Sequence, residues 1–94
     1  MTALLDRSSD SPEIAASAPV PLDSLTPQAR AEIVALPEGH GAARRLAELG
    51  IFIGGQVKVV RIAPLSGPVL LEVRGSLVAL GRRLAHRIVV RVLA

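Results

Sequence analysis

Alternating apolar and polar residues predict a series of short β-strands along most of this chain. In the segment 29–36, Ala31, Ile33 and Ala35 fall on one face and their neighbours on the other, which is the period of a half-buried strand. Similar short apolar runs, separated by turn residues, predict four more strands at 56–63, 69–74, 77–80 and 88–92. The turns between them contain Gly or Pro, as at Pro64–Pro68 and Gly75.

The run at 56–63 changes phase in its middle. Val57 and Val59 share one face, and the apolar positions then shift to Val60 and Ile62. One slipped residue inside an apolar run predicts a β-bulge or a sharp bend, as small barrels need at their corners.

One segment has a helical period instead. Ala42, Leu46 and Leu49, within 41–49, follow one another at i, i+4 and i+7, and Ile53 extends this apolar stripe beyond the helix. Gly50 follows directly, where a left-handed C-terminal cap is expected. Residues 81–86 predict a single further helical turn.

Five short strands with turns between them indicate an all-β domain that contains a short helix. A closed or nearly closed antiparallel barrel removes the exposed edges that a small open sheet would leave. With one helix inserted between the first and second predicted strands, the architecture is a small SH3-like barrel. Its core must be aliphatic, because Phe52 is the one aromatic residue in 94.

The first 21 residues differ in composition from the rest. They are rich in Ser, Ala, Pro and acidic residues and show no sustained period, so they predict a flexible leader, 1–21, before a single domain, 22–94. A docking arm and an inert extension are both open for this leader. Residues 1–23 hold four acidic residues and one basic, a net charge of −3, whereas residues 24–94 hold ten basic and four acidic, a net charge of +6.

The composition limits where in the cell the protein is expected and which metal or cofactor sites it can form. No apolar run approaches the roughly 18 residues that span a bilayer, and the first residues match neither a signal peptide nor a transit peptide, so we expect a cytoplasmic protein without membrane insertion. The absence of cysteine excludes disulfides, thiolate metal sites and Cys catalysis. His40 and His86 lack metal-site spacing, and Gly39-His40-Gly41 lacks the remainder of a phosphate loop. We therefore nominate no metal and no cofactor.

Catalysis is not expected either. The hydroxyl residues of the domain all stand in turn-like contexts, where such side chains are normally structural, and no G-x-S-x-G motif is present. The four hydroxyl residues are Ser24, Thr26, Ser66 and Ser76.

Two binding hypotheses remain from the residues alone. Five arginines near the last strands could contact phosphates of a nucleic acid, but Tyr and Trp are absent, so stacking platforms are missing and an ordinary solvated face is the competing interpretation. These arginines are Arg74, Arg82, Arg83, Arg87 and Arg91. Phe52, between Ile51 and Ile53, is either an exposed anchor for a partner protein or a plug at one end of the barrel.

Three blocks of the sequence together resemble the FeoA family of the bacterial ferrous iron transport system: RRLAELGIFIGGQVKVV, APLSGPVLLEVRG and LVALGRRLAHRIVV. The resemblance covers about 22–92. The positions that match the family pattern are Leu22, Leu25, Pro27, Arg44 or Arg45, Leu46, Glu48, Leu49, Gly50, Gly54, Pro64, Leu65, Pro68, Arg74, Gly75, Leu80, Ala85, Ile88 and Val90. Departures from it are Gln28 in place of Gly, Ile53 in place of Pro, Gly81 in place of Arg and Leu84 in place of an acid.

The resemblance implies a non-catalytic accessory protein of Fe²⁺ transport with an SH3-like barrel. It also implies a partner, the cytosolic G-protein domain of the membrane transporter FeoB. Arg44, Arg45 and Phe52 are the residues that we expect to contact this partner. A small basic barrel that binds nucleic acid is the alternative, less favoured because stacking residues are missing. Oligomeric state is left open.

Overall fold

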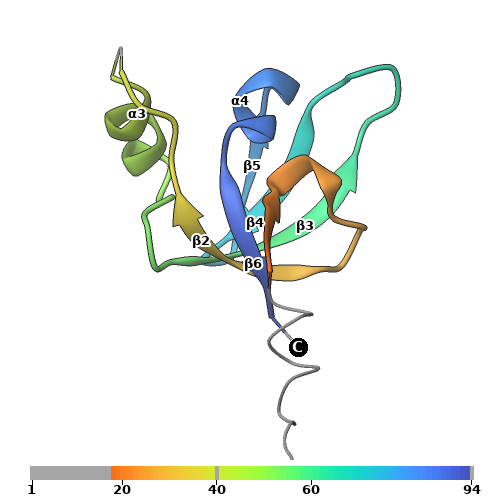
Figure 1. Ribbon diagram of the computed structural model, residues 1–94. Helices are drawn as coiled ribbons and strands as arrows, with labels where there is room; N and C mark the ends of the chain where they lie inside the picture. Colours follow the sequence, from red (N-terminus) through yellow and green to blue (C-terminus); the bar gives the residue numbers. More distant parts are fainter. Residues whose placement is uncertain (1–17, 40, 94) are drawn as a thin grey trace, which may run out of the picture.

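The computed structural model describes residues 18–39 and 41–93, which form one strongly curved sheet with short helices at its connections (Figure 1). The elements in chain order are β1 (Pro19–Pro21), the 3-10 helix η1 (Leu22–Ser24), β2 (Arg30–Ala35), α3 (Ala42–Glu48), β3 (Gln56–Ile62), β4 (Val69–Val73), β5 (Ser76–Leu80), α4 (Arg82–His86) and β6 (Val89–Val92).

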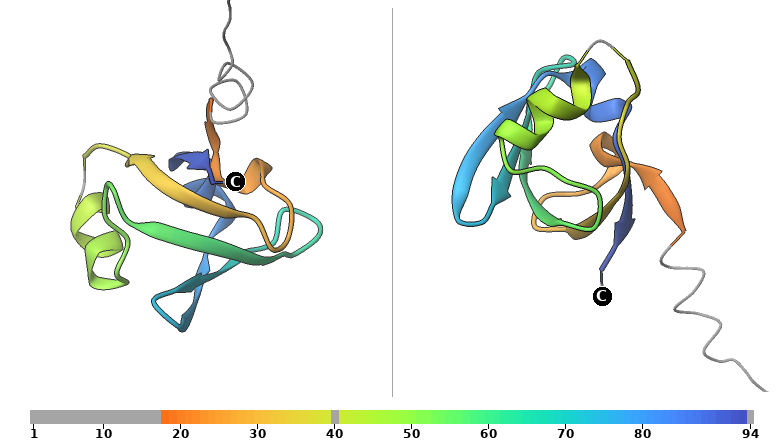
Figure 2. Two further views of the ribbon diagram at one scale, coloured as in Figure 1. Left: turned by 90° about the horizontal axis from the view of Figure 1, so that it is seen from below. Right: turned by 90° about the vertical axis from the view of Figure 1, so that its left-hand side faces the viewer.

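The six strands form one antiparallel sheet in the order β1-β6-β2-β3-β4-β5. Figure 2 shows the sheet curling round the core to form a small barrel. No ladder joins β1 to β5 within the described part of the chain, so these two strands are the edges of the sheet. The helices α3 and α4 lie at one end of the barrel and residue 93 at the other (Figures 1 and 2).

All five predicted strands and both helical segments are present, each within a few residues of its predicted bounds. The structure adds a sixth strand that the sequence pattern did not predict. Pro19–Pro21, which we had assigned to the leader, form β1 and pair with Val89–Arg91 of β6. The remainder of the predicted leader, residues 1–17, lies outside the described residues, as does His40.

The core is aliphatic, as predicted, and its residues are the inward-facing members of the strands together with single residues from the helices and loops. The buried residues are Leu22, Leu25, Ala31, Ile33, Leu46, Ile51, Val57, Val59, Val69, Leu71, Val73, Leu80, Ala85, Ile88 and Val90. The predicted bulge is confirmed, because the register between β3 and β4 shifts between Val59 and Arg61. A second register shift, between Ile33 and Ala35, bends β2 against β6.

The predicted apolar stripe of the helix is only partly buried. Leu46 is fully buried, but Leu49 is 39% exposed and Ile53 is 65% exposed. The reason is the helix C-terminus: Gly50 has a φ of 88°, its N–H donates to Ala47, and the N–H of Ile51 donates to Leu46. This left-handed cap, confirmed here, turns the chain so that Ile51 enters the core.

Within the described residues, no helix has the length and apolar content needed to cross a bilayer.

Candidate functional site

The loop that follows α3 presents an aromatic residue to solvent. Phe52 is 44% exposed, whereas its neighbour Ile51 is 1% exposed and fills the core position. Of the two interpretations of Phe52, the plug is therefore wrong, because Ile51 closes this end of the barrel. The guanidinium carbon of Arg74 lies 6.0 Å from the centroid of the Phe52 ring, at the limit of a cation–π contact.

We call Leu49, Phe52 and Ile53 the elbow patch. These three side chains follow one another along the turn out of α3, and each is more than a third exposed. Phe52 is the aromatic member of the three and has a cation near its ring, a combination of residue types that is enriched at protein interfaces. The elbow patch is thus a candidate anchor for a partner protein.

The two predicted arginines of α3 point into different surface hollows. Arg44 lines a hollow of about 470 Å³ that also contains Leu36 and Ile53. Arg45 instead lines a larger groove, of about 1060 Å³, next to Arg83 and Arg87 of the α4 region. The structure therefore brings Arg44 close to the elbow patch and places Arg45 with the arginines of α4.

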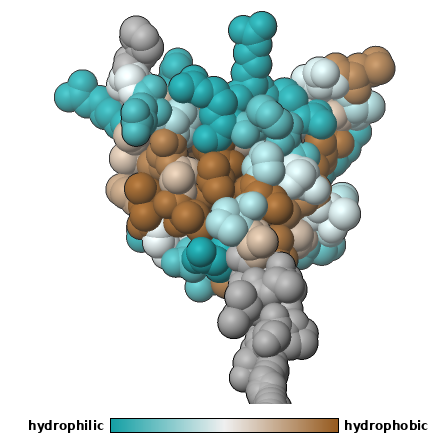
Figure 3. All heavy atoms as spheres, viewed as in Figure 1, coloured by the Kyte–Doolittle hydropathy of each residue, from teal (hydrophilic) through white to brown (hydrophobic). Residues whose placement is uncertain are grey.

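A hydrophobic area covers the β2 and β6 side of the molecule, below a hydrophilic rim (Figure 3). The apolar residues of these strands that are only partly buried and lie outside the core include Val34, Ala35 and Val89. A polar face is the usual state for the outer side of an antiparallel sheet in a monomer. This apolar area is a second surface suited to contact with another protein.

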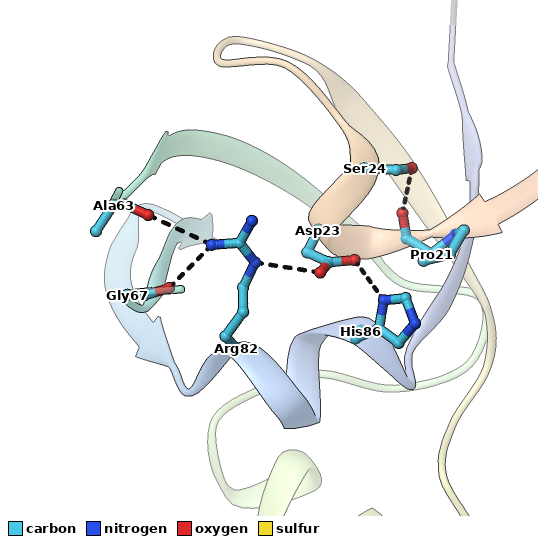
Figure 4. Close-up of polar contacts among 7 residues, drawn as sticks. All are labelled: Pro21, Asp23, Ser24, Ala63, Gly67, Arg82 and His86. Atoms are coloured by element: carbon cyan, nitrogen blue, oxygen red, sulfur yellow. Dashed lines mark hydrogen bonds and ion pairs between the residues drawn. The ribbon is translucent and has the colours of Figure 1, made fainter. Parts of the chain in front are cut away.

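Asp23 organises polar contacts among residues that line the groove (Figure 4). Its Oδ2 accepts a hydrogen bond from Nε of Arg82 over 3.1 Å, and its Oδ1 lies 3.0 Å from Nδ1 of His86. Nη1 of Arg82 also donates to the carbonyls of Ala63 and Gly67, at 3.3 Å each. Arg82 is therefore a structural cross-link between η1, the 63–67 turn and α4.

This cross-link bears on the prediction that five arginines form one stripe able to contact phosphates. Arg82 is held by Asp23 and two carbonyls, and Arg74 lies over Phe52, so at least two of the five arginines already contact the protein itself. Arg82, Arg83 and Arg87 all line the groove together with Arg45. Three of the five arginines thus gather in one groove, whereas Arg74 lines a different hollow.

The part of the chain that the structure describes holds no group of three His, Asp or Glu side chains placed to bind a metal. Of the four hydroxyl residues, Ser24 has a clear structural partner, because its Oγ donates to the carbonyl of Pro21 over 2.7 Å. Sequence reasoning missed the position of Arg74 beside Phe52. The turn predicted at Gly75 places Arg74 at the end of a strand, but no sequence signal places it beside Phe52.

The geometry defines a small SH3-like β-barrel domain with an exposed apolar elbow, and the comparison with known sequences gives its family. The sequence model of the FeoA domain matches residues 20–92, so the chain belongs to the FeoA domain family. This also confirms the fold class predicted from the sequence.

Individual relatives agree. The chain is 46% identical over 52 residues to a protein of Methanocaldococcus jannaschii named as an Fe(2+) transport protein A, a match that covers 55% of this chain and about three fifths, 61%, of that relative. A crystal structure of an iron uptake regulatory protein (FeoA) has a TM-score of 0.72 and 32% identity, covering 81% of this chain and 99% of that one. The solution structure of FeoA from Chlorobium tepidum has a TM-score of 0.73 and 35% identity, covering 80% and 71%.

Proposed function

We propose that this chain is a non-catalytic, cytoplasmic accessory protein of ferrous iron transport and that it acts by binding the cytosolic G-protein domain of FeoB. Membership of the FeoA family is the observation that carries the proposal. Relatives named for Fe(2+) transport and iron uptake give the substrate of the system, Fe²⁺.

The surface supports a binding role. The elbow patch offers an exposed aromatic anchor, and Arg44 beside it supplies charge for steering and orientation. Few residues carry most of the free energy of a typical interface, and aromatic and Arg side chains are the commonest among them. We therefore assign Phe52 as the central contact, Arg44 as its charged neighbour and Arg45 as a peripheral contact.

The direct test is the affinity of the chain for the isolated cytosolic domain of FeoB, measured at low and at physiological salt. We expect saturable binding that weakens as salt rises, because a body with a net charge of +6 contributes long-range attraction to an acidic surface. In cells, deletion of the chain should lower Fe²⁺ uptake. Absence of binding at both salt concentrations, together with unchanged uptake, would refute the proposal.

A matched pair of variants tests the surface. Phe52→Ala should weaken binding by about 2 kcal/mol or more, the range of an interface hot spot. Leu65→Ala is the control, because Leu65 is 98% exposed on a turn away from the elbow patch. Equal affinity of both variants and the parent chain would exclude the elbow patch as the docking surface.

A further inference from the structure

Two cations face each other on the outer side of the sheet. Arg30 of β2 is directly opposite Lys58 of β3 in the ladder. The next pair of that ladder, Ala31 and Val57, is buried, so alternation directs Arg30 and Lys58 outward. Directly opposed residues have Cβ atoms about 5 Å apart, and like charges in such a pair are destabilising.

One carboxylate, Glu72, lies in register beside this pair. Among residues 18–39 and 41–93, neither Arg30 nor Lys58 has an acidic oxygen within 4.0 Å. Glu72 stands opposite Lys58 on the far side, in β4, without forming an ion pair with it. The sheet thus holds two positive charges side by side, with one carboxylate next to them and no ion pair formed among the described residues.

These cations line a polar hollow of about 500 Å³, which we call the Arg30–Lys58 hollow. Its other lining residues are Gln28, Gln56, Val57, Glu72, Arg74 and Gly75. Three cations and one carboxylate give the hollow a net charge of +2. The two glutamine amides add neutral N–H donors, so the hollow is equipped to bind an anion with several acceptor oxygens.

Backbone strain is concentrated at the same place. Four non-glycine residues of the described chain have a positive φ, and two of them, Gln28 at 77° and Arg74 at 53°, line this hollow. Glycine or asparagine would occupy either position with less strain. Two long polar side chains thus stand at positions of positive φ around one hollow.

We propose that the Arg30–Lys58 hollow binds the phosphate group of a small phosphorylated molecule. A phosphomonoester carries a charge of about −1.5 to −2 and three acceptor oxygens, which matches the net charge of +2 and the converging donors. A carboxylate has one charge and two oxygens and leaves part of the hollow's charge unpaired. The volume lies in the range of small-molecule sites, and Glu72 accepts a hydrogen bond from a hydroxyl or amine of the same ligand.

This inference does not depend on FeoB binding, and its test uses the full chain alone. Inorganic phosphate and glycerol 3-phosphate are titrated at constant ionic strength, with chloride as the replacement anion, and backbone amide shifts are followed by NMR. We expect saturable shifts at Gln28, Arg30, Gln56, Lys58 and Gly75. The absence of saturable shifts with either compound would overturn the proposal.

Variants separate a site from general charge attraction. Arg30→Gln and Lys58→Gln should each weaken phosphate binding by about tenfold or more, the effect of removing a charged hydrogen-bond donor. Arg61→Gln is the control, because Arg61 is an exposed cation of the same strand that does not line the hollow. Equal weakening by Arg61→Gln would overturn the proposal.

Two further measurements complete the test. Without phosphate, Arg30→Gln should unfold at the same temperature as the parent chain or higher, because it removes the opposed like charges. Vesicles of phosphatidylglycerol distinguish a dissolved ligand from a membrane surface. Binding to vesicles without any response to dissolved glycerol 3-phosphate would overturn the assignment to a small molecule.

Discussion

Arg82 and Asp23 lie 59 positions apart in the chain, yet Nε of Arg82 donates a hydrogen bond to Oδ2 of Asp23 over 3.1 Å. The Asp23 side chain is 14% exposed, so water screens this contact less than it screens a surface ion pair. Since Arg82 also reaches the 63–67 turn, one carboxylate fixes three segments that are distant in sequence.

Asp23→Ala should therefore lower the free energy of unfolding by about 1–3 kcal/mol, the effect of leaving a partly buried charged donor without its partner. For a domain of this size, each kcal/mol corresponds to about 4–8 °C in the unfolding midpoint. Ser24→Ala, which removes one exposed hydrogen bond next to Asp23, is the control and should change stability by less. Equal losses in the two variants would show that the cross-link adds nothing.

The cap of α3 gives a second prediction. Gly50→Ala places a Cβ at a φ of 88° and 3.2 Å from Cγ1 of Val73, so we expect a loss of about 1–2 kcal/mol or more in urea unfolding. Gly81→Ala is matched to it, because Gly81 has a φ of −58° and no atom within 4 Å of an added Cβ. That variant should lose less stability than Gly50→Ala, because the weaker N-cap of α4 is offset by the lower entropy of the unfolded chain.

Neighbouring residues of the elbow should behave in opposite ways. Ile51→Ala removes a side chain that is 1% exposed and should destabilise the fold by about 2–5 kcal/mol. Phe52→Ala removes a side chain that is 44% exposed and should keep most of the stability while losing affinity for FeoB. Thermal unfolding and binding, measured on the same preparations, check both; a large loss of stability in Phe52→Ala would assign that ring to the core.

A stabilising substitution is also expected. Gln28 has a φ of 77°, a backbone conformation that glycine adopts with less strain. Gln28→Gly should raise the free energy of unfolding by about 0.5–1 kcal/mol, because relief of left-handed strain exceeds the added entropy of the unfolded chain. Thr26→Gly, at an ordinary φ in the same loop, should lower it. The shift of the urea midpoint measures both, and destabilisation by Gln28→Gly would contradict the strain argument.

The five strands β2 to β6 could be predicted because their alternation of apolar and polar residues reflects burial on one face. The slip from Val59 to Val60 even located the bulge of β3. β1 escaped prediction because its sequence, Pro-Val-Pro, has two residues that cannot donate to a ladder and are tolerated at a sheet edge. Its partner strand, β6, is about 70 residues away, and local pattern carries no trace of that pairing.

The candidate surfaces were harder to predict. The helical period predicted that Leu49 and Ile53 share the buried face of Leu46. It could not show that the chain turns away after the helix, so that Leu49 and Ile53 stay exposed. Arg44 and Arg45 are adjacent in sequence, yet they line different hollows. The opposition of Arg30 to Lys58 depends on the register of two strands separated by a helix, which no short sequence window contains.

The two edges of the sheet are chemically unequal. In β1 only Val20 has an N–H, and the carbonyl of Pro21 already accepts a bond from Ser24. β5, Ser-Leu-Val-Ala-Leu, has no charge and no proline, and Leu77 is 69% exposed. Charges and prolines are the usual guards against strand addition. Of the two edges, β5 is therefore the one with fewer barriers to the addition of a further strand.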